Sequence, residues 1–200
     1  MDFDLLEHYN IPVLAHANAK TPAEAVRAAS RMGFPVALKL VSSKILHKTD
    51  AGALSLDLRS AEQVEKEFAR LMKIDASGSV LVQAFRPGRA ELIIGGRLDP
   101  QFGPVVLLGL GGVYTEVLRD ASLRICPVSG WDAREMLRSL KCYPILAGAR
   151  GSKPIDEGAL IKIITSVSKM MVREKISELD INPLLVRNDG LWAADSRVIR

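Results

Sequence analysis

The sequence predicts an α/β (α+β) protein with two lobes, and three observations carry this prediction. Up to residue 83, short apolar runs alternate with segments that have helix start signals. Beyond residue 84, successive apolar runs are separated by glycine-containing turns, which is typical of an antiparallel-rich sheet. The change falls in a stretch without low complexity. It therefore marks a boundary between an N-terminal lobe, residues 1–83, and a C-terminal lobe, residues 84–200.

The helices are predicted from their start and stop signals. Residues 3–9 form a short amphipathic segment. Residues 21–24 (Thr-Pro-Ala-Glu) supply an N-cap, a proline at the first helical position and a glutamate at the third, and Gly33 can end that helix. Residues 60–63 (Ser-Ala-Glu-Gln) are a second capping box, which opens a helix to about Lys73. In the C-terminal lobe, Asp132 and Asp156 are predicted to begin two more helices.

Apolar runs predict the strands. They lie at residues 34–41, 53–58 and 79–83 in the N-terminal lobe, and at 90–98, 104–110, 113–118, 122–128, 179–186 and 191–198 in the C-terminal lobe. The run at 53–58 alternates with period two, which predicts a half-exposed strand. The last two runs are joined through Asn188-Asp189-Gly190, which predicts a hairpin.

A polar loop between two apolar runs is the stretch most indicative of function. It contains His47, Thr49, Asp50, Gly52 and two lysines. Such polar density between strands is expected where a loop binds or reacts. Cationic side chains and one nucleophilic imidazole are suited to chemistry on a phosphate, and the other interpretation of His47 is a solvated loop histidine.

Lys39 is unusual because it stands in the middle of an apolar run. One interpretation is that its stem follows a sheet edge and its ammonium group reaches water. The other is that the ammonium group contacts a phosphate. Both remain open at this point.

The terminal hairpin predicts a pair of oxygen ligands. If its connection holds an even number of residues, Asn182 and Asp195 fall on the same face of the sheet, directly opposite or diagonal to each other. Carboxylate and amide oxygens are suitable ligands for Mg²⁺. The hairpin is therefore a candidate magnesium site.

The composition excludes several classes of protein. The 200 residues are 48% hydrophobic and 25% charged, as in an ordinary globular protein. A net charge of +4 from scattered basic residues favours a small anionic ligand over nucleic acid, and 5% aromatic residues are few for base stacking. Cys126 and Cys142 form no C-x-x-C pair, so no structural zinc is expected. An acidic N-terminus and the lack of a long apolar run predict a cytoplasmic protein without membrane contact.

Three motifs in order resemble the ATP-grasp (β) subunit of ADP-forming acyl-CoA synthetases, such as acetate–CoA ligase (ADP-forming), which is itself similar to the succinyl-CoA synthetase β subunit. The motifs are His47-Lys48-Thr49-Asp50, residues 99–104 leading to Gly109-Leu110-Gly111-Gly112 and Glu116, and residues 179–184 (Leu-Asp-Ile-Asn-Pro-Leu). The resemblance runs from about Leu5 to Val198, nearly the whole chain.

The resemblance implies an ATP-grasp fold and an acid–thiol ligase subunit that works with Mg²⁺ and ATP or ADP. A phosphoryl group would pass between a partner phosphohistidine, His47 and Mg-ADP. Lys39, Gln83 and Glu91 would contact the nucleotide, and Asn182 and Asp195 would hold Mg²⁺. The run Gly109-x-Gly111-Gly112 sits between predicted strands, so it is no CoA-binding Rossmann motif. The implied partner is a CoA-binding α-type subunit, in an α2β2 hetero-oligomer.

The alternative function is a nucleotide-binding regulatory module, like the ATP-grasp segment of some protein acetyltransferases, which needs the nucleotide pocket but not His47. The sequence also departs from the family pattern at two positions. Ala53 stands where many relatives have glycine, and Ala84 stands where they often have glutamate. These departures bear on rate or affinity rather than on the fold.

Overall fold

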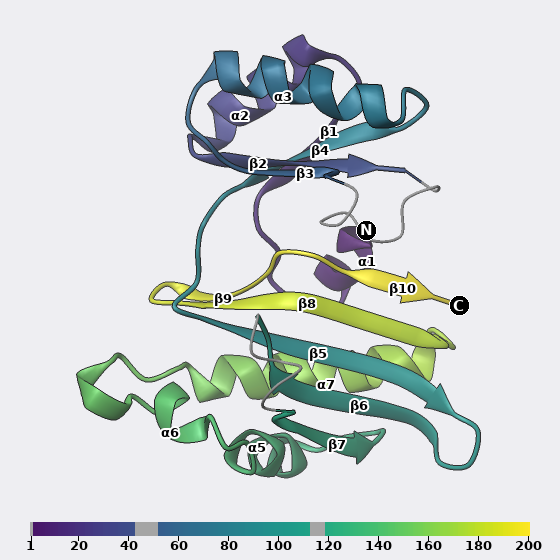
Figure 1. Ribbon diagram of the computed structural model, residues 1–200. Coiled ribbons are helices and arrows are strands. Elements are labelled where there is room, and N and C mark those ends of the chain that lie inside the picture. Colours follow the sequence, from purple (N-terminus) through teal and green to yellow (C-terminus); the bar gives the residue numbers. More distant parts are fainter. Residues whose placement is uncertain (1, 43–51, 113–118) are drawn as a thin grey trace. The chain divides into compact units, whose positions relative to one another are not determined.

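The structure is a computed structural model that describes residues 2–42, 52–112 and 119–200. The chain divides into two compact units. The central unit comprises Leu14–Arg86, and the terminal unit comprises Met1–Val13 together with Pro87–Arg200. The mixed α/β class with antiparallel sheets is confirmed (Figure 1).

The central unit is an antiparallel sheet with two helices on one face (Figure 1). Its elements are β1 (His16–Ala19), α2 (Pro22–Met32), β2 (Val36–Val41), β3 (Leu54–Leu58), α3 (Ala61–Ile74) and β4 (Ser79–Ala84). The strands lie in the order β1-β4-β2-β3. Leu38, Leu40, Val80 and Val82 are fully buried in one core cluster with side chains of α2 and α3. Alternate residues of β2 and β4, including Lys39, therefore lie on the opposite face of the sheet.

Strand β1 was not predicted. The sequence His-Ala-Asn-Ala has little intrinsic preference for a strand. It is extended because it pairs with β4 from His16 opposite Gln83 to Ala19 opposite Val80. Tertiary pairing, rather than local propensity, creates this edge strand.

The predicted alternation in β3 was wrong, although the strand itself is present. Ser55 and Leu58 are the buried residues, and Leu56 is 50% exposed. The register with β2 shifts between Val36 and Leu38, and Asp57 has a φ of 57°. A bulge of this kind inserts one residue and changes which side chains face the core.

The helix caps are confirmed in part. Thr21 and Glu24 form the predicted capping box, and Gly33 ends α2 with a φ of 77°. At α3, Ser60 caps Gln63 N as predicted. The amide oxygen of Gln63, however, accepts from Arg59 N at 2.7 Å, one residue before the N-cap.

The terminal unit is built on a six-stranded sheet within the described residues. Its elements are α1 (Phe3–His8), β5 (Ala90–Asp99), β6 (Gly103–Leu110), β7 (Ala121–Ile125), α5 (Gly130–Arg138), α6 (Tyr143–Leu146), the 3-10 turn η1 (Ala149–Gly151), α7 (Glu157–Arg173), β8 (Glu178–Arg187), β9 (Gly190–Ala193) and β10 (Arg197–Ile199). The strand order is β10-β8-β5-β6-β7, and β9 also pairs with β8. Helix α7 packs against β5 and β6 (Figure 1). Leu92 and Ile94 of β5 are fully buried.

Two expectations for this unit need correction. Helix α5 begins after Ser129, whose hydroxyl caps Asp132 N; Asp132 is the third residue of the helix and not its cap. The return arm of the terminal hairpin, predicted as one strand over 191–198, is two strands, β9 and β10. The predicted strand at 113–118 lies outside the described residues.

The first 13 residues belong by contact to the terminal unit, whereas the sequence-based division put them in the N-terminal lobe. Val13 forms a parallel bridge with Ala193, and Ala193 N donates to Pro12 O at 2.8 Å. Tyr9 Oη donates to Glu174 Oε1 at 2.7 Å. These bonds join segments that are 165 or more residues apart, so local sequence could not reveal them. Within the described ranges, no helix is long and apolar enough to cross a membrane.

Candidate functional site

Lys39 and Gln83 lie on the face of the central sheet that is opposite to α2 and α3. Lys39 is opposite Leu81, and Gln83 is opposite Ala37, so the two polar residues are diagonal neighbours on adjacent strands. Both are buried, at 6% and 2% exposure. Because β2 lies between β4 and β3, Lys39 is not at a sheet edge. The interpretation that its stem follows an edge is therefore wrong.

Gln83 has an incompletely satisfied amide. Within the described part of the chain, its Nε2 is buried and has no hydrogen-bond partner. An unsatisfied buried donor typically costs about 1–3 kcal/mol. A ligand that accepted this hydrogen bond would recover that cost. His16, directly opposite Gln83 on β1, is on the same face and was missed because β1 was not predicted.

The hairpin of β8 with β9 and β10 brings Asn182 and Asp195 together. Leu184 is opposite Ala193, and Asp180 is opposite Arg197. Asn182 lies midway between Asp180 and Leu184, and Asp195 lies midway between Ala193 and Arg197. The register shared by the two pairs therefore puts Asn182 directly opposite Asp195. The connection between Arg187 and Gly190 holds two residues, an even number, which is the condition that the sequence analysis set.

The position of Asp195 is supported by main-chain bonds on both sides. Ala194 N donates to Pro183 O at 3.0 Å, which continues the pairing with β8 across the gap between β9 and β10. Ser196 N donates to Asp195 Oδ1 at 2.8 Å. The carboxylate is therefore oriented by the backbone of its own turn.

Asp180 is a third oxygen-bearing residue of this hairpin and was not among the predicted site residues. It lies two residues before Asn182 on β8, hence on the same face. Burial raises the pKa of Asp180, and the negative charge of Asp195 raises it further. Side chains two residues apart on a strand share a face, so the predicted strand at residues 179–186 could have identified Asp180 as a neighbour of Asn182.

The donor set suits Mg²⁺. Among the residues that the structure describes, no group of three or more His, Cys, Asp and Glu side chains could hold a metal. Mg²⁺ does not require such a group, because it is commonly bound by one or two carboxylates, water and substrate phosphates. The repulsion that Asp180 experiences from Asp195 is what a bound cation would relieve.

Glu91 lies on β5, opposite Leu185 of β8. The Gly111-Gly112 turn passes close to it: Gly111 N donates to Glu91 O at 2.8 Å. A Cβ atom at Gly112 would lie 3.3 Å from Glu91 Oε2, and Gly112 also has a φ of 78°. Glycine is thus favoured at this turn by its backbone conformation, and a side chain there would also press on the Glu91 carboxylate.

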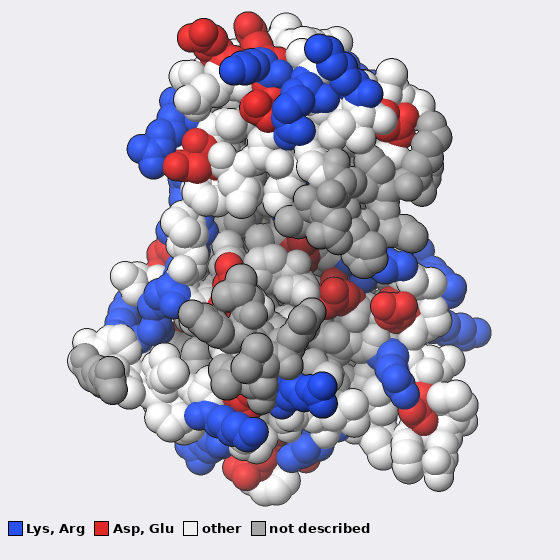
Figure 2. Space-filling model, viewed as in Figure 1, with Lys and Arg blue, Asp and Glu red and all other residues white. Residues whose placement is uncertain are grey.

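The predicted site residues thus form two groups, one in each unit. The central unit holds Lys39 and Gln83, and the terminal unit holds Glu91, Asn182 and Asp195. His47 lies outside the described residues. On the face shown in Figure 2, Lys and Arg side chains lie among Asp and Glu side chains.

Comparison with known proteins identifies the family. Residues 2–199 match the ATP-grasp domain model. The chain is 40% identical over 204 residues to the β subunit of acetate–CoA ligase (ADP-forming) I of Pyrococcus furiosus, covering 98% of this chain and 88% of that protein. The chain therefore belongs to the ATP-grasp family, in the branch that contains the β subunits of ADP-forming acetate–CoA ligases.

Solved structures agree with this assignment. Dinucleotide forming acetyl-coenzyme A synthetase 1 of Ca. Korarchaeum cryptofilum, in complex with coenzyme A and Ca-AMPCP, superposes with a TM-score of 0.92 at 38% identity, covering 98% of this chain and 90% of that chain. A second structure of that enzyme contains Mg-AMPPCP and has its phosphohistidine segment pointing towards the nucleotide binding site; its TM-score is 0.86 at 39% identity, with 97% and 87% covered. The predicted ATP-grasp fold is confirmed.

Proposed function

We propose that this chain is the nucleotide-binding subunit of an ADP-forming acyl-CoA (acetyl-CoA) synthetase, an acid–thiol ligase. The observation that carries the proposal is its match, over nearly the full length, to a β subunit of that enzyme class. The opposition of Asn182 and Asp195 supports it, because a nucleotide-binding subunit of this kind needs a place for Mg²⁺.

The proposed reaction is a reversible phosphoryl relay. Acyl-CoA and phosphate yield an acyl phosphate and free CoA on a partner subunit. A partner histidine takes the phosphoryl group as the P–O bond to the carboxylate breaks. A neutral nitrogen of His47 then forms a new P–N bond as the partner's P–N bond breaks. Finally an oxygen of the ADP β-phosphate attacks the phosphoryl group on His47, which releases ATP and restores the imidazole.

The described residues would bind the nucleotide rather than react. Lys39 would place a positive charge at the phosphates, and Gln83 would hydrogen-bond the base. Glu91 would contact the nucleotide from β5, and Asn182 with Asp195 would hold Mg²⁺. When bound, Mg²⁺ would neutralise charge on the phosphates during transfer. Asp180, on the same face, would add negative charge beside that cation.

The proposed partner is a CoA-binding α-type subunit, which would supply the acyl site and its own histidine. Relatives named as β subunits support a requirement for a second subunit. We propose an α2β2 hetero-oligomer.

The division of labour is testable with the purified chain. It is expected to bind Mg-ATP but to form no acetyl-CoA from acetate, CoA and ATP until a CoA-binding partner is added. A coupled assay for ADP release, with and without the partner, measures this directly. Acetyl-CoA formation by the chain alone would overturn the proposed division. If the chain binds nucleotide but no mixture with a partner forms acetyl-CoA, the regulatory nucleotide-binding module becomes the better function.

Gln83 provides a sharper test of the nucleotide contact. Gln83→Met removes the unsatisfied amide but keeps the length of the side chain, so the free chain should be as stable as wild type or more stable. Nucleotide affinity should fall roughly 10-fold, since a hydrogen bond in a buried site contributes about 1 kcal/mol or somewhat more. Thermal unfolding and calorimetry measure the two effects. Gln101→Met, at an exposed turn, is the matched control and should change neither; unchanged affinity in Gln83→Met would exclude the contact.

A further inference from the structure

The sheet of the terminal unit has one face that packs against α7 and one, the distal face, that points away from it. Gly96 of β5 belongs to the packed face, because a Cβ atom added there would lie 2.5 Å from Met171 Sδ of α7. Side chains alternate along a strand, so Gly95 belongs to the distal face. Gly95 is directly opposite Asp180 of β8, which shares the distal face with Asn182. Gly95 therefore lies one row away from the candidate magnesium site.

Gly95 is a glycine that neither its backbone nor its packing requires. Its φ is not positive. A Cβ atom at this position would have only Leu107 Cβ and Leu179 O within 4 Å, both at an ordinary contact distance of 3.8 Å. A hollow of the sheet has Gly95 in its lining, together with Ile93, Leu107 and Asp180. A glycine inside a strand weakens the strand, and it often marks a place where a ligand approaches the backbone closely.

Arg197 brings a positive charge to the distal face. It is directly opposite Asp180, and it follows Asp195 by two residues, a span of about 7 Å along a strand. Burial raises the pKa of Asp180, as does the charge of Asp195, whereas the charge of Arg197 lowers it. Arg197 is exposed, and among the described residues its guanidinium group has no hydrogen bond and no ion pair. A cation that is not bonded to protein thus lies beside the candidate magnesium site.

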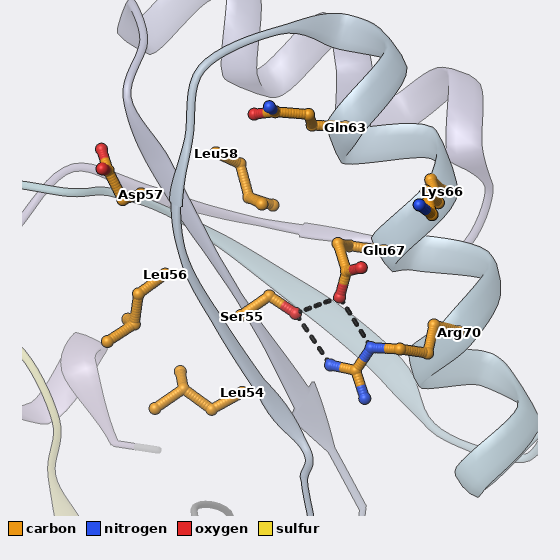
Figure 3. A pocket seen from close by; sticks show the side chains of 9 residues that line it. All are labelled: Leu54, Ser55, Leu56, Asp57, Leu58, Gln63, Lys66, Glu67 and Arg70. Atoms are coloured by element: carbon orange, nitrogen blue, oxygen red, sulfur yellow. Dashed lines mark hydrogen bonds and ion pairs between the residues drawn. The ribbon is translucent and has the colours of Figure 1, made fainter.

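Arg70 of the central unit shows the contrast. It lines a hollow between β3 and α3, and its donors are bonded to the protein (Figure 3). Nε donates to Glu67 Oε2 at 2.6 Å, Nη2 to Ser55 Oγ at 2.9 Å, and Nη1 to Gly52 O at 2.8 Å. A ligand could bind this guanidinium group only by replacing these bonds. Of the two arginines, Arg197 is the one available to an anion.

We propose that Arg197 binds the terminal phosphoryl group of ATP, and that Gly95 leaves room for this group beside the candidate magnesium site. The proposal deepens the proposed function and rests on it, because it names two residues for the group that the relay transfers. A guanidinium group suits this task, since it remains charged and its planar fork can bind two phosphate oxygens at once. Arg197 would form no covalent bond. It would neutralise negative charge on the phosphoryl oxygens during transfer.

Arg197 is tested by comparing Mg-ATP with Mg-ADP, because ADP lacks the terminal phosphoryl group. In calorimetric titrations, Arg197→Gln should weaken Mg-ATP binding at least about 10-fold and Mg-ADP binding by no more than about 2-fold. Arg197→Lys, which keeps the charge but not the fork, should retain part of the affinity for Mg-ATP. Arg134→Gln removes an exposed positive charge from α5 and is the matched control, which should change neither affinity. Equal losses for both nucleotides in Arg197→Gln, or no loss, would overturn the role of Arg197.

Gly95 is tested by adding a side chain. Gly95→Ala should be at least as stable as wild type in thermal unfolding, because its Cβ atom meets no atom closer than 3.8 Å and glycine costs chain entropy. Gly95→Val should fill more of the hollow and weaken Mg-ATP binding roughly 10-fold, with Gly95→Ala between it and wild type and Mg-ADP binding nearly unchanged. Gly130→Ala is the matched control, since its Cβ atom would also lie 3.8 Å from its nearest neighbour, Ile161, at the start of α5. Wild-type affinity of Gly95→Val for Mg-ATP would show that the phosphoryl group does not enter the hollow.

The outcomes also separate this inference from the proposed function. If the wild-type chain binds neither nucleotide, the proposed function fails and the inference fails with it. If wild type binds Mg-ATP and the Arg197 and Gly95 variants bind it equally well, only the inference fails. EDTA distinguishes a phosphate contact from an effect on the metal: without Mg²⁺, Arg197→Gln should still bind ATP more weakly than wild type. Loss of that difference in EDTA would overturn the direct contact.

Discussion

Replacing His47 with asparagine is expected to abolish acyl-CoA formation by the reconstituted complex while leaving nucleotide affinity nearly intact. A covalent carrier needs the imidazole nitrogen that attacks phosphorus, and an amide cannot replace it. His47→Lys should be equally inactive, although it keeps a positive charge. A histidine that only attracted phosphate electrostatically would tolerate that substitution. The Lys variant therefore separates covalent from electrostatic roles.

The direct measurement is the phosphoprotein. Wild-type chain incubated with labelled Mg-ATP and partner should carry an acid-labile, alkali-stable phosphoryl group, and His47→Asn should carry none. His8→Asn is the matched control, because His8 is an exposed residue at the end of α1 and should remain fully active. Turnover by His47→Asn would end the relay proposal and make the regulatory nucleotide-binding module the better function.

Asp195→Ala is expected to weaken Mg-ADP binding by at least about 10-fold. Mutation of residues that only hydrogen-bond to a metal's ligands commonly lowers metal affinity by that much, so loss of a ligand itself should lower it at least as far. The loss should not come from unfolding. Removing Asp195 relieves the repulsion that it exerts on Asp180 and also removes the hydrogen bond that it accepts from Ser196 N, two effects of opposite sign, so the stability of the free chain should change little. Calorimetric titration with Mg-ADP, together with thermal unfolding, checks both expectations.

Metal removal completes the test. EDTA should reduce the nucleotide affinity of wild type to that of Asp195→Ala and should have little further effect on the variant. Asp189→Ala is the control, because this carboxylate lies in the turn of the same hairpin but is 61% exposed and paired with Arg187. If Asp195→Ala binds Mg-ADP as tightly as wild type, the hairpin does not hold the metal.

Several features were predictable because they depend on neighbours in sequence. The capping box of Thr21 and Glu24 closes within one helical turn, so four residues define it. The opposition of Asn182 and Asp195 follows from period-two geometry and an even turn, which are both local properties of a hairpin. The family motifs, read in order, were enough to predict the ATP-grasp fold that the comparisons confirm.

Other features depend on where distant segments meet. Edge strand β1 exists because β4 pairs with it, and the bulge in β3 buries Ser55 instead of Leu56. The raised pKa of Asp180 requires a fold that buries it beside Asp195.

The sequence by itself thus determined the class of fold and the hairpin pairing and indicated a candidate chemistry for His47, because caps and strand periodicity act over a few residues and each family motif is a short run. Only the tertiary structure decided that Lys39 lies in an interior strand and that residues 1–13 join the terminal unit. These outcomes are set by packing and hydrogen bonds between segments far apart in the chain, where local pattern carries no information about which partner is near.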